Sequence, residues 1–361
     1  MKKIAILLFL SAIALLARSA NPHISFFVEL KGPEFSKLFG DSLLIRDLQQ
    51  MHASLRIGLI DFSKERTETI QKLNRAGIPV YAWLLLPEDE GYWFYMNNGD
   101  KAVKRYAKFK KWSKENQLKW AGLGIDLELD FNDARMAVKH PVRLAWKAYR
   151  RLFDNTSIVK GREKYQGLIN QMIADSFKVE SYVIPVIYDE RLKHTTSLQK
   201  LSGILDVQTP VEIPMDYTSA MGAGSITVYH NDHQPIALGI TGGGVNIEGV
   251  QPKFMTWDDL SRDLLVANQY TNEIIIFCLE ATVKNGWLPK IMSFNYNQPV
   301  PDVSALVKQQ EKSGMTIQTF LVILDHPILA TLGVLIVVCL LIYLIYRFIR
   351  AVIRRLSGQR R

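Results

Sequence analysis

The chain has 361 residues, of which 44 are basic and 35 are acidic, and 48% are hydrophobic. Residues 1–18 hold three of the basic residues, residues 347–361 hold six, and neither segment contains an acid. The part between them has 35 residues of each sign and is neutral, so the high pI does not indicate a nucleic-acid partner. Cys278 falls in a predicted strand and Cys339 in a predicted membrane segment, which excludes a disulfide framework.

Residues 1–19 are typical of a secretory signal peptide. Met1-Lys2-Lys3 forms a short basic region, and an apolar run from Ile4 to Leu16 follows it. Ala17-Arg18-Ser19 places small residues before a cut at Ala20. An uncleaved anchor is the alternative, although the apolar run is short for a membrane span.

Residues 20–299 alternate β-branched or aromatic runs with amphipathic stretches, which indicates βα units. Strands are predicted near residues 24–30, 55–62, 79–86, 121–129, 181–188, 206–216, 235–241 and 273–280. Eight strands in this length predict an α/β fold of the (β/α)8 TIM-barrel type. An open doubly wound sheet is the alternative, but no glycine-rich fingerprint follows the first strand.

Helical patterns lie between these strands. Residues 63–76 start at Ser63, a plausible N-cap, and a second pattern covers residues 101–116. A third pattern covers residues 258–269 behind Thr256. The tetrapeptide Gly40-Asp-Ser-Leu43 matches the start of a lipase motif, but a helix start at Asp41 or Ser42 explains it better. Residues 134–177 form an insertion, predicted as two helices broken near His140-Pro141.

The C-terminal part predicts a membrane anchor. Residues 300–325 are polar and proline-rich at their start and are expected to form a stalk. Residues 326–346 are long and apolar enough to span a bilayer as one helix. The arginines of residues 347–361 favour a cytoplasmic tail, which places residues 20–325 outside, in the periplasm or at the cell surface.

The fourth predicted strand, Ala121-Gly-Leu-Gly-Ile-Asp-Leu-Glu-Leu-Asp130, carries three carboxylates two residues apart. In a strand, this period sends Asp126, Glu128 and Asp130 to one face. Active sites of such barrels lie at the carboxyl ends of the strands, so the three are candidate catalytic residues. Their mutual repulsion is expected to raise the pKa of Glu128.

Other residues near strand ends are candidates for substrate binding. Glu280 ends an otherwise apolar strand, where an unpaired acid costs several kcal/mol. Asp216 and Tyr217 follow the sixth strand, and aromatic rings suited to stacking on sugars lie near other strand ends. We therefore expect the pocket to contain the following residues: Asp216, Tyr217, Glu280, Trp83, Trp93 and Trp257.

Gly124-Ile-Asp-Leu-Glu-Leu-Asp130 resembles the Asp-x-x-Asp-x-Asp-x-Glu motif of the chitinase-like family-18 TIM-barrel glycoside hydrolases. Pro214-Met-Asp-Tyr217 is similar to the Met-x-Tyr-Asp segment of that family. The resemblance implies a hydrolase of an N-acetylated polysaccharide or cell-wall glycan, with Glu128 as general acid and Asp126 orienting the 2-acetamido group of the substrate. Tyr217 would contact the same group.

The motif departs from the family at Ala121 and Gly124, which stand where the family has its first two aspartates. A match that starts from the first aspartate makes Asp130 the acid. The Asp-x-Glu pair is also similar to that of the family-25 lysozymes. Glycosidases with a Glu nucleophile on the seventh strand are disfavoured, because that strand ends in Leu238-Gly-Ile-Thr-Gly-Gly-Gly244, without a carboxylate.

Two other functions stay open. The missing aspartates favour a non-catalytic barrel that binds glycan, and the same carboxylates could hold Mg²⁺ or Ca²⁺ in a metal-dependent hydrolase. His230-Asn-Asp-His233 is better explained by a loop than by a metal site. We expect no cofactor, a glycan as substrate and the membrane as partner.

Overall fold

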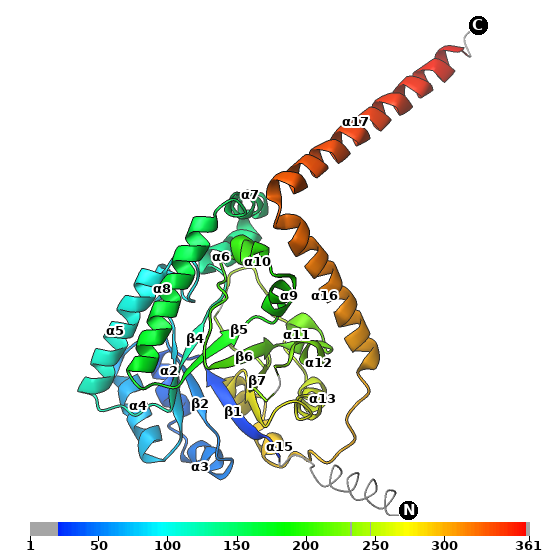
Figure 1. The fold of residues 1–361 in the computed structure, drawn as a ribbon. Helices are drawn as coiled ribbons and strands as arrows, with labels where there is room; N and C mark the ends of the chain where they lie inside the picture. Colours follow the sequence, from blue (N-terminus) through cyan, green and yellow to red (C-terminus); the bar gives the residue numbers. More distant parts are fainter. Residues whose placement is uncertain (1–20, 232, 246, 359–361) are drawn as a thin grey trace, which may run out of the picture.

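The computed structural model describes residues 21–231, 233–245 and 247–358. Eight parallel strands form a closed barrel in which each strand pairs with the next and β8 pairs with β1 (Figure 1). The strands are β1 (His23–Val28), β2 (Leu55–Leu59), β3 (Val80–Leu84), β4 (Gly122–Asp126), β5 (Val179–Val183), β6 (Val211–Asp216), β7 (Ile236–Leu238) and β8 (Glu273–Ile276). This confirms the (β/α)8 barrel.

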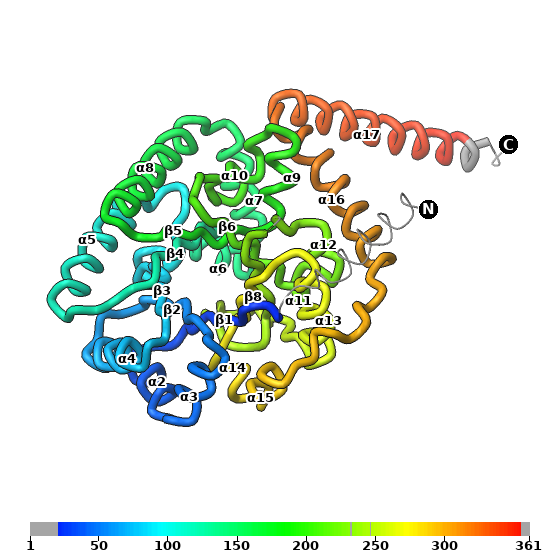
Figure 2. The backbone as a smooth tube through the Cα atoms, turned by 60° about the horizontal axis from the view of Figure 1, so that its bottom comes forward, coloured from blue at the N-terminus to red at the C-terminus, as the bar shows by residue number. Residues whose placement is uncertain are grey.

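Helices follow the strands and surround the barrel (Figure 2). They are α2 (Gly32–Leu38), α3 (Ser42–Gln50), α4 (Lys64–Arg75), α5 (Gly99–Glu115), α6 (Phe131–Lys139), α7 (Pro141–Arg151), α8 (Asn155–Ala174), α9 (Val186–Lys193), α10 (Ser197–Ser202), α11 (Thr218–Met221), α12 (Ser225–Tyr229), α13 (Trp257–Ala267), α14 (Leu279–Lys284), α15 (Leu288–Met292), α16 (Ser304–Leu324) and α17 (Pro327–Gly358).

Several helix starts follow from side-chain caps that the sequence indicates. Ser63 accepts a hydrogen bond from the Arg66 N–H at the start of α4. Thr256 and Asp259 form a reciprocal capping box at the start of α13. Asp41 caps α3, which confirms a helix start at the lipase-like tetrapeptide.

Alternation along the strands separates two hydrophobic regions. On β2, Leu55, Ile57 and Leu59 point outward and are fully buried against the helices. The inward-facing cluster contains Phe27, Trp83 and other residues that fill the barrel interior. The barrel interior is therefore packed toward the amino ends of the strands, and open space is left at their carboxyl ends.

A charged layer closes the amino-terminal end of the barrel interior. The Arg56 guanidinium is 1% exposed and donates to both carboxylate oxygens of Glu180, at 3.0 and 3.2 Å. Nη2, which donates to Glu180 Oε2, also lies 2.9 Å from Glu273 Oε1, and Nη1 donates to the Ser54 hydroxyl at 2.8 Å. Complete pairing allows these charges to stay buried beneath the apolar layer.

Some predicted boundaries were wrong. The fifth strand covers residues 179–183, and residues 186–193 form helix α9 after Pro185 instead of continuing the strand. The insertion after β4, predicted as two helices, contains most of α6 and all of α7 and α8, with the predicted break at His140. The predicted signal peptide, residues 1–19, lies outside the described residues.

The segment expected as a stalk is mostly helical and lies against the barrel domain. Helix α16 packs on α9, α10 and α12, and the Gln318 amide donates to Asp189 at 2.7 Å. The Ser197 hydroxyl donates to the carbonyl of Leu321 at 2.9 Å. Helix α17 then projects away from the domain (Figure 1).

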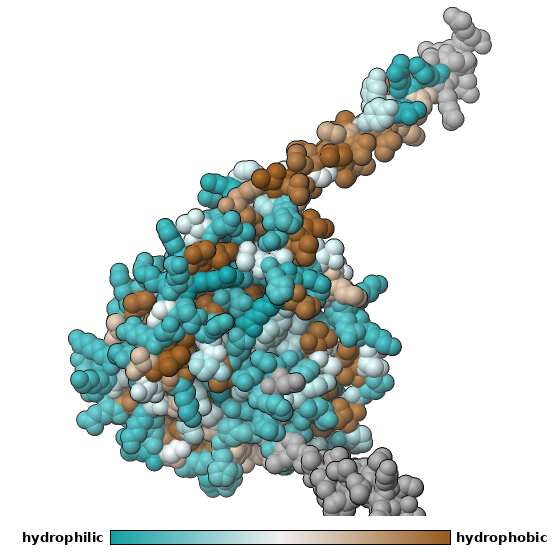
Figure 3. Space-filling model, in the orientation of Figure 1, coloured by the Kyte–Doolittle hydropathy of each residue, from teal (hydrophilic) through white to brown (hydrophobic). Residues whose placement is uncertain are grey.

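Helix α17 is a candidate membrane span. Its stretch from Pro327 to Arg354 is long and apolar enough to cross a bilayer, and none of its most apolar window is buried. Figure 3 shows this exposed hydrophobic surface running from the domain toward a hydrophilic end.

Candidate active site

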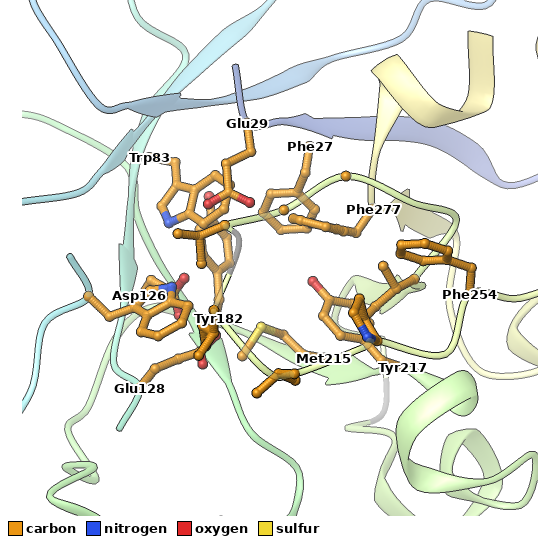
Figure 4. A pocket seen from close by; sticks show the side chains of 18 residues that line it. Phe27, Glu29, Trp83, Asp126, Glu128, Tyr182, Met215, Tyr217, Phe254 and Phe277 are labelled. Carbon is orange, nitrogen blue, oxygen red and sulfur yellow. The ribbon is translucent and has the colours of Figure 1, made fainter. Parts of the chain in front are cut away.

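A cavity of about 520 Å³ opens at the carboxyl ends of the strands. Figure 4 shows Asp126 and Glu128 on one side of this cavity and Tyr217 and Phe254 on the other. The lining residues are Phe27, Glu29, Trp83, Trp93, Asp126, Glu128, Tyr182, Met215, Tyr217, Ile240, Gly243, Gly244, Val245, Ile247, Val250, Pro252, Phe254 and Phe277. Most of them are apolar or aromatic, as in typical ligand sites.

Asp126 and Glu128 enter the cavity from one face of an extended segment. Strand β4 ends at Asp126, but the Glu128 N–H still donates to the Phe94 carbonyl at 3.0 Å. The Phe94 N–H in turn donates to the Asp126 carbonyl at 3.0 Å. This bridge continues the pleat by two residues, so Leu127 turns into the core and both acids face the cavity.

Asp130 does not share this face. The chain turns after Glu128, and Asp130 caps α6 by accepting a hydrogen bond from the Asn132 N–H at 2.9 Å. Its other oxygen lies 3.4 Å from Lys147. The expected trio of carboxylates is thus a pair, because a helix begins where a third strand position would be.

Glu29 contributes a third carboxylate from the end of β1, and it was not among the predicted site residues. The Tyr92 hydroxyl donates to Glu29 Oε1, and the Glu29 N–H donates to Glu280 Oε1 at 3.1 Å. Phe27 faces the cavity, and position 29 lies two residues further on the same strand face. Strand alternation could therefore have identified Glu29.

Burial changes the protonation of all three acids. It raises the pKa of Glu128 to about 7. From the sequence we expected repulsion by the neighbouring acids to cause this rise, but burial causes it. Burial also raises the pKa of Glu29 to about 8, with Glu280 and Glu128 adding to the rise and the Tyr92 hydrogen bond opposing it. The pKa of Asp126 rises well above its ordinary value through burial and then through Glu128 and Glu29. The site therefore holds protonated carboxyl groups near neutral pH.

Interlocking aromatic rings form the floor of the cavity. The ring of Phe27 lies edge-on to Trp83 at 5.3 Å and to Tyr182 at 4.8 Å, between centroids. Phe277 packs at 5.9 Å from Phe27 and 5.7 Å from Tyr217. Such contacts hold the walls in fixed orientations. Three of the predicted aromatic residues, Trp83, Trp93 and Tyr217, line the cavity.

Tyr182 also explains why position 124 is glycine. Gly124 faces inward two residues before Asp126, and a Cβ there would overlap the Tyr182 hydroxyl and ring. That hydroxyl donates to Glu180 at 2.9 Å in the charged layer below. The space that a side chain at 124 would need is therefore occupied by a tyrosine with a fixed partner.

The glycine run after β7 forms one wall of the cavity. Gly243 and Gly244 have φ of +75° and +85°, which favour glycine. A Cβ at Gly244 would contact the Phe277 ring and lie 3.6 Å from Glu29 Oε2. The loop backbone thus approaches the acids closely.

The structure does not bring three predicted residues to the cavity wall. Asp216 alternates with Met215 and Tyr217, so it points outward and is fully buried near Asp263, and this burial raises its pKa to about 8. Trp257 begins α13 on the outside of the barrel, 6.0 Å from the Trp287 ring. Glu280 lies behind the wall as the partner of Glu29.

A metal-dependent hydrolase would need a set of metal ligands, and the described part of the chain holds no preformed set. Within residues 21–231, 233–245 and 247–358, no group of three His, Cys, Asp or Glu side chains is placed to hold a metal ion. Asp232, in the loop His230-Asn-Asp-His233, lies outside the described residues.

Comparisons with known proteins give a likeness of overall structure only. No family model and no curated protein matches the sequence. Saccharomyces cerevisiae Gas2p in complex with laminaritriose and laminaritetraose matches with a TM-score of 0.37, 12% identity and 73% of this chain covered. The same yeast protein in complex with a further compound matches over 83% of this chain, also with a TM-score of 0.37. This chain spans 58% and 66% of those two chains.

Proposed function

We propose that the protein is a membrane-anchored glycoside hydrolase that acts on an N-acetylated polysaccharide or cell-wall glycan. The observation that carries the proposal is the pair Asp126 and Glu128, which enter one aromatic-walled cavity from the same strand face. The rings around the cavity offer faces for sugar stacking, and a volume of about 520 Å³ suits a small number of sugar units.

Glu128 would act as the general acid. A carboxyl group with a pKa of about 7 is largely protonated in weakly acidic solution and can donate its proton to the leaving glycosidic oxygen. As the bond from the anomeric carbon to that oxygen breaks, the ionised Glu128 becomes the base that deprotonates the incoming water. One residue thus serves both halves of the reaction.

Asp126 would orient the 2-acetamido group, whose carbonyl oxygen attacks the anomeric carbon in substrate-assisted hydrolysis. Tyr217, whose hydroxyl points into the cavity, would contact the same group from the opposite wall (Figure 4). Glu29 would hydrogen-bond a sugar hydroxyl, since Tyr92 fixes one of its oxygens and its carboxyl faces the cavity. The roles of Asp126, Glu128 and Tyr217 are those that the resemblance to the chitinase-like family implies, and the role of Glu29 comes from its position in the cavity.

In the proposed topology, α17 crosses the membrane with the barrel outside and residues 347–361 in the cytoplasm. The exposed apolar surface of α17 and the arginines after it support this arrangement.

The test compares Glu128→Gln with Glu115→Gln, a matched change at an exposed position of α5. Both full-length proteins are purified in detergent and assayed on chitooligosaccharides and peptidoglycan fragments. Loss of a general acid lowers turnover by roughly 10²–10⁴-fold, whereas Glu115→Gln leaves it unchanged. Wild-type turnover in Glu128→Gln would rule out the mechanism.

A glycan-binding barrel without catalysis is the second candidate, and Gly124 favours it because the family has an aspartate there. Binding of oligosaccharide by the wild-type protein, without release of shorter products over long incubation, would select this function.

A further inference from the structure

Helix α7 exposes its apolar side to solvent. Val142, Trp146 and Phe153 are 83%, 61% and 47% exposed, and their spacing places them along one side of the helix and its continuation. The Tyr149 ring lies between the last two, stacked on Trp146 at 5.5 Å and edge-on to Phe153 at 5.3 Å between centroids. These side chains form a continuous apolar surface, here called the α7 face.

The opposite side of α7 carries charges that pair with buried aspartates. Lys147 and Arg151 each lie 2.5 Å from an oxygen of Asp133, and Lys147 also lies 3.4 Å from Asp130. Both aspartates are buried. A helix on the surface of a soluble domain normally buries its apolar side, so the orientation of α7 is inverted and is fixed by ion pairs.

The α7 face is continuous with the start of the candidate membrane span. The Tyr149 hydroxyl lies 2.9 Å from the Thr331 hydroxyl of α17, and Ile328 and Leu329 nearby in the chain are 66% and 67% exposed. In Figure 1, α7 lies beside the junction of α16 and α17. Because α16 is packed on the barrel, this junction is held close to the domain.

The charges around the α7 face suit an anionic surface. Residues 139–153 contain five basic residues and no acid, and three of these, Lys139, Lys147 and Arg151, are paired with Glu248 or Asp133. The charge offered to a surface therefore comes from Arg143 and Arg150, which are exposed. A groove of about 740 Å³ runs beside the face, and Arg143, Arg150, Trp146 and Phe153 are among the residues that line it. Exposed arginine next to tryptophan is typical of helices that lie in the interface of a membrane.

We propose that α7 is an interfacial helix, whose apolar face enters the anionic lipid bilayer that α17 crosses. Val142, Trp146 and Phe153 lie at the boundary of the acyl chains, and Arg143 and Arg150 contact headgroup phosphates. The inference rests on the membrane anchor of the proposed function, but not on its catalysis.

This docking places the cavity rim near the bilayer. Helix α6 ends against the loop that lines the cavity, where Lys139 pairs with Glu248 at 2.6 Å and Val138 packs beside Gly249. The substrate is then a glycan held at the membrane surface rather than one distant from it.

The experiment measures membrane depth at position 146 by electron paramagnetic resonance. The full-length chain carries Cys339→Ser and Trp146→Cys, is spin-labelled at 146, and is placed in nanodiscs of phosphatidylcholine and phosphatidylglycerol. Cys278 is buried and is retained. The control is Lys111→Cys in the same background, at a side chain that is 78% exposed on α5.

A label in the interface is more accessible to oxygen and several-fold less accessible to a water-soluble nickel complex than the control label. Equal accessibility of the two labels would overturn the proposal. Dipolar coupling between labels of two copies, in detergent and in nanodiscs alike, would overturn it in favour of self-association. No substrate is present, so a failure of docking and a failure of hydrolysis are seen separately.

Discussion

The pH dependence of turnover tests the role of Glu128 most directly. Its pKa of about 7 replaces an ordinary value of 4.5. At pH 6 a carboxyl with the ordinary value is about 3% protonated, whereas Glu128 is about 90% protonated, roughly a 30-fold gain in the acid form. Since the pKa is raised, the active form is present below pH 7 and is lost as the pH rises above it.

We therefore expect kcat/KM on a chitooligosaccharide to be flat near pH 6 and to fall about tenfold per pH unit above pH 7, roughly 90-fold between pH 6 and pH 9. The assay follows release of reducing ends. In the Glu29→Gln variant, kcat/KM is still expected to begin its fall near pH 7, because burial and not Glu29 sets the pKa of Glu128.

A second measurement separates proton donation from positioning. Glu128→Gln loses most activity on substrates with poor leaving groups and retains far more on aryl glycosides whose leaving group needs no proton. If both substrate classes lose activity equally, or if the wild-type profile has no limb between about pH 6 and 8, the reasoning fails.

Three further changes test the packing around the site. Gly124→Ala is expected to cost about 1–3 kcal/mol in chemical denaturation through overpacking, whereas Gly167→Ala, where a new Cβ meets no atom within 4 Å, does not destabilise; equal stability of the two variants would contradict the geometry. Arg56→Met leaves the buried Glu180 carboxylate without its partner and also removes the partner of the half-buried Glu273, and it is expected to cost about 3–5 kcal/mol by the same measurement; an unchanged midpoint would show that the layer is not ionised. Tyr217→Phe lowers turnover by roughly tenfold or more if its hydroxyl contacts substrate, while Trp257→Phe, outside the cavity, leaves turnover unchanged.

The sequence predicted the barrel well because strand alternation and helix caps are local signals. Ser63 and Thr256 are caps in the structure, and the inward period of β4 brings Asp126 and Glu128 to the cavity. The same period failed at Asp130, because a capping interaction with the next helix ended the strand. Local pattern does not reveal where such competition is resolved.

Other features depended on contacts between distant segments. Trp257 and Trp83 are both aromatic residues suited to stacking on sugars, and the sequence pattern predicted both in the pocket. Only the barrel geometry shows that α13 carries Trp257 to the outer surface. The pairing of Glu29 with Tyr92 joins segments 63 residues apart. The inverted face of α7 was also hidden, since its ion-pair partner Asp133 belongs to another helix.

The contact between Gly124 and Tyr182 couples two positions on neighbouring strands. A side chain at 124 requires the tyrosine to leave, and removing the tyrosine alone leaves a void above Glu180 and withdraws its hydrogen bond. Each single change is unfavourable although the pair together is sterically consistent, which is epistasis between adjacent strands. An aspartate at position 124 therefore requires two substitutions made together, one at Gly124 and one at Tyr182, and a single substitution does not suffice.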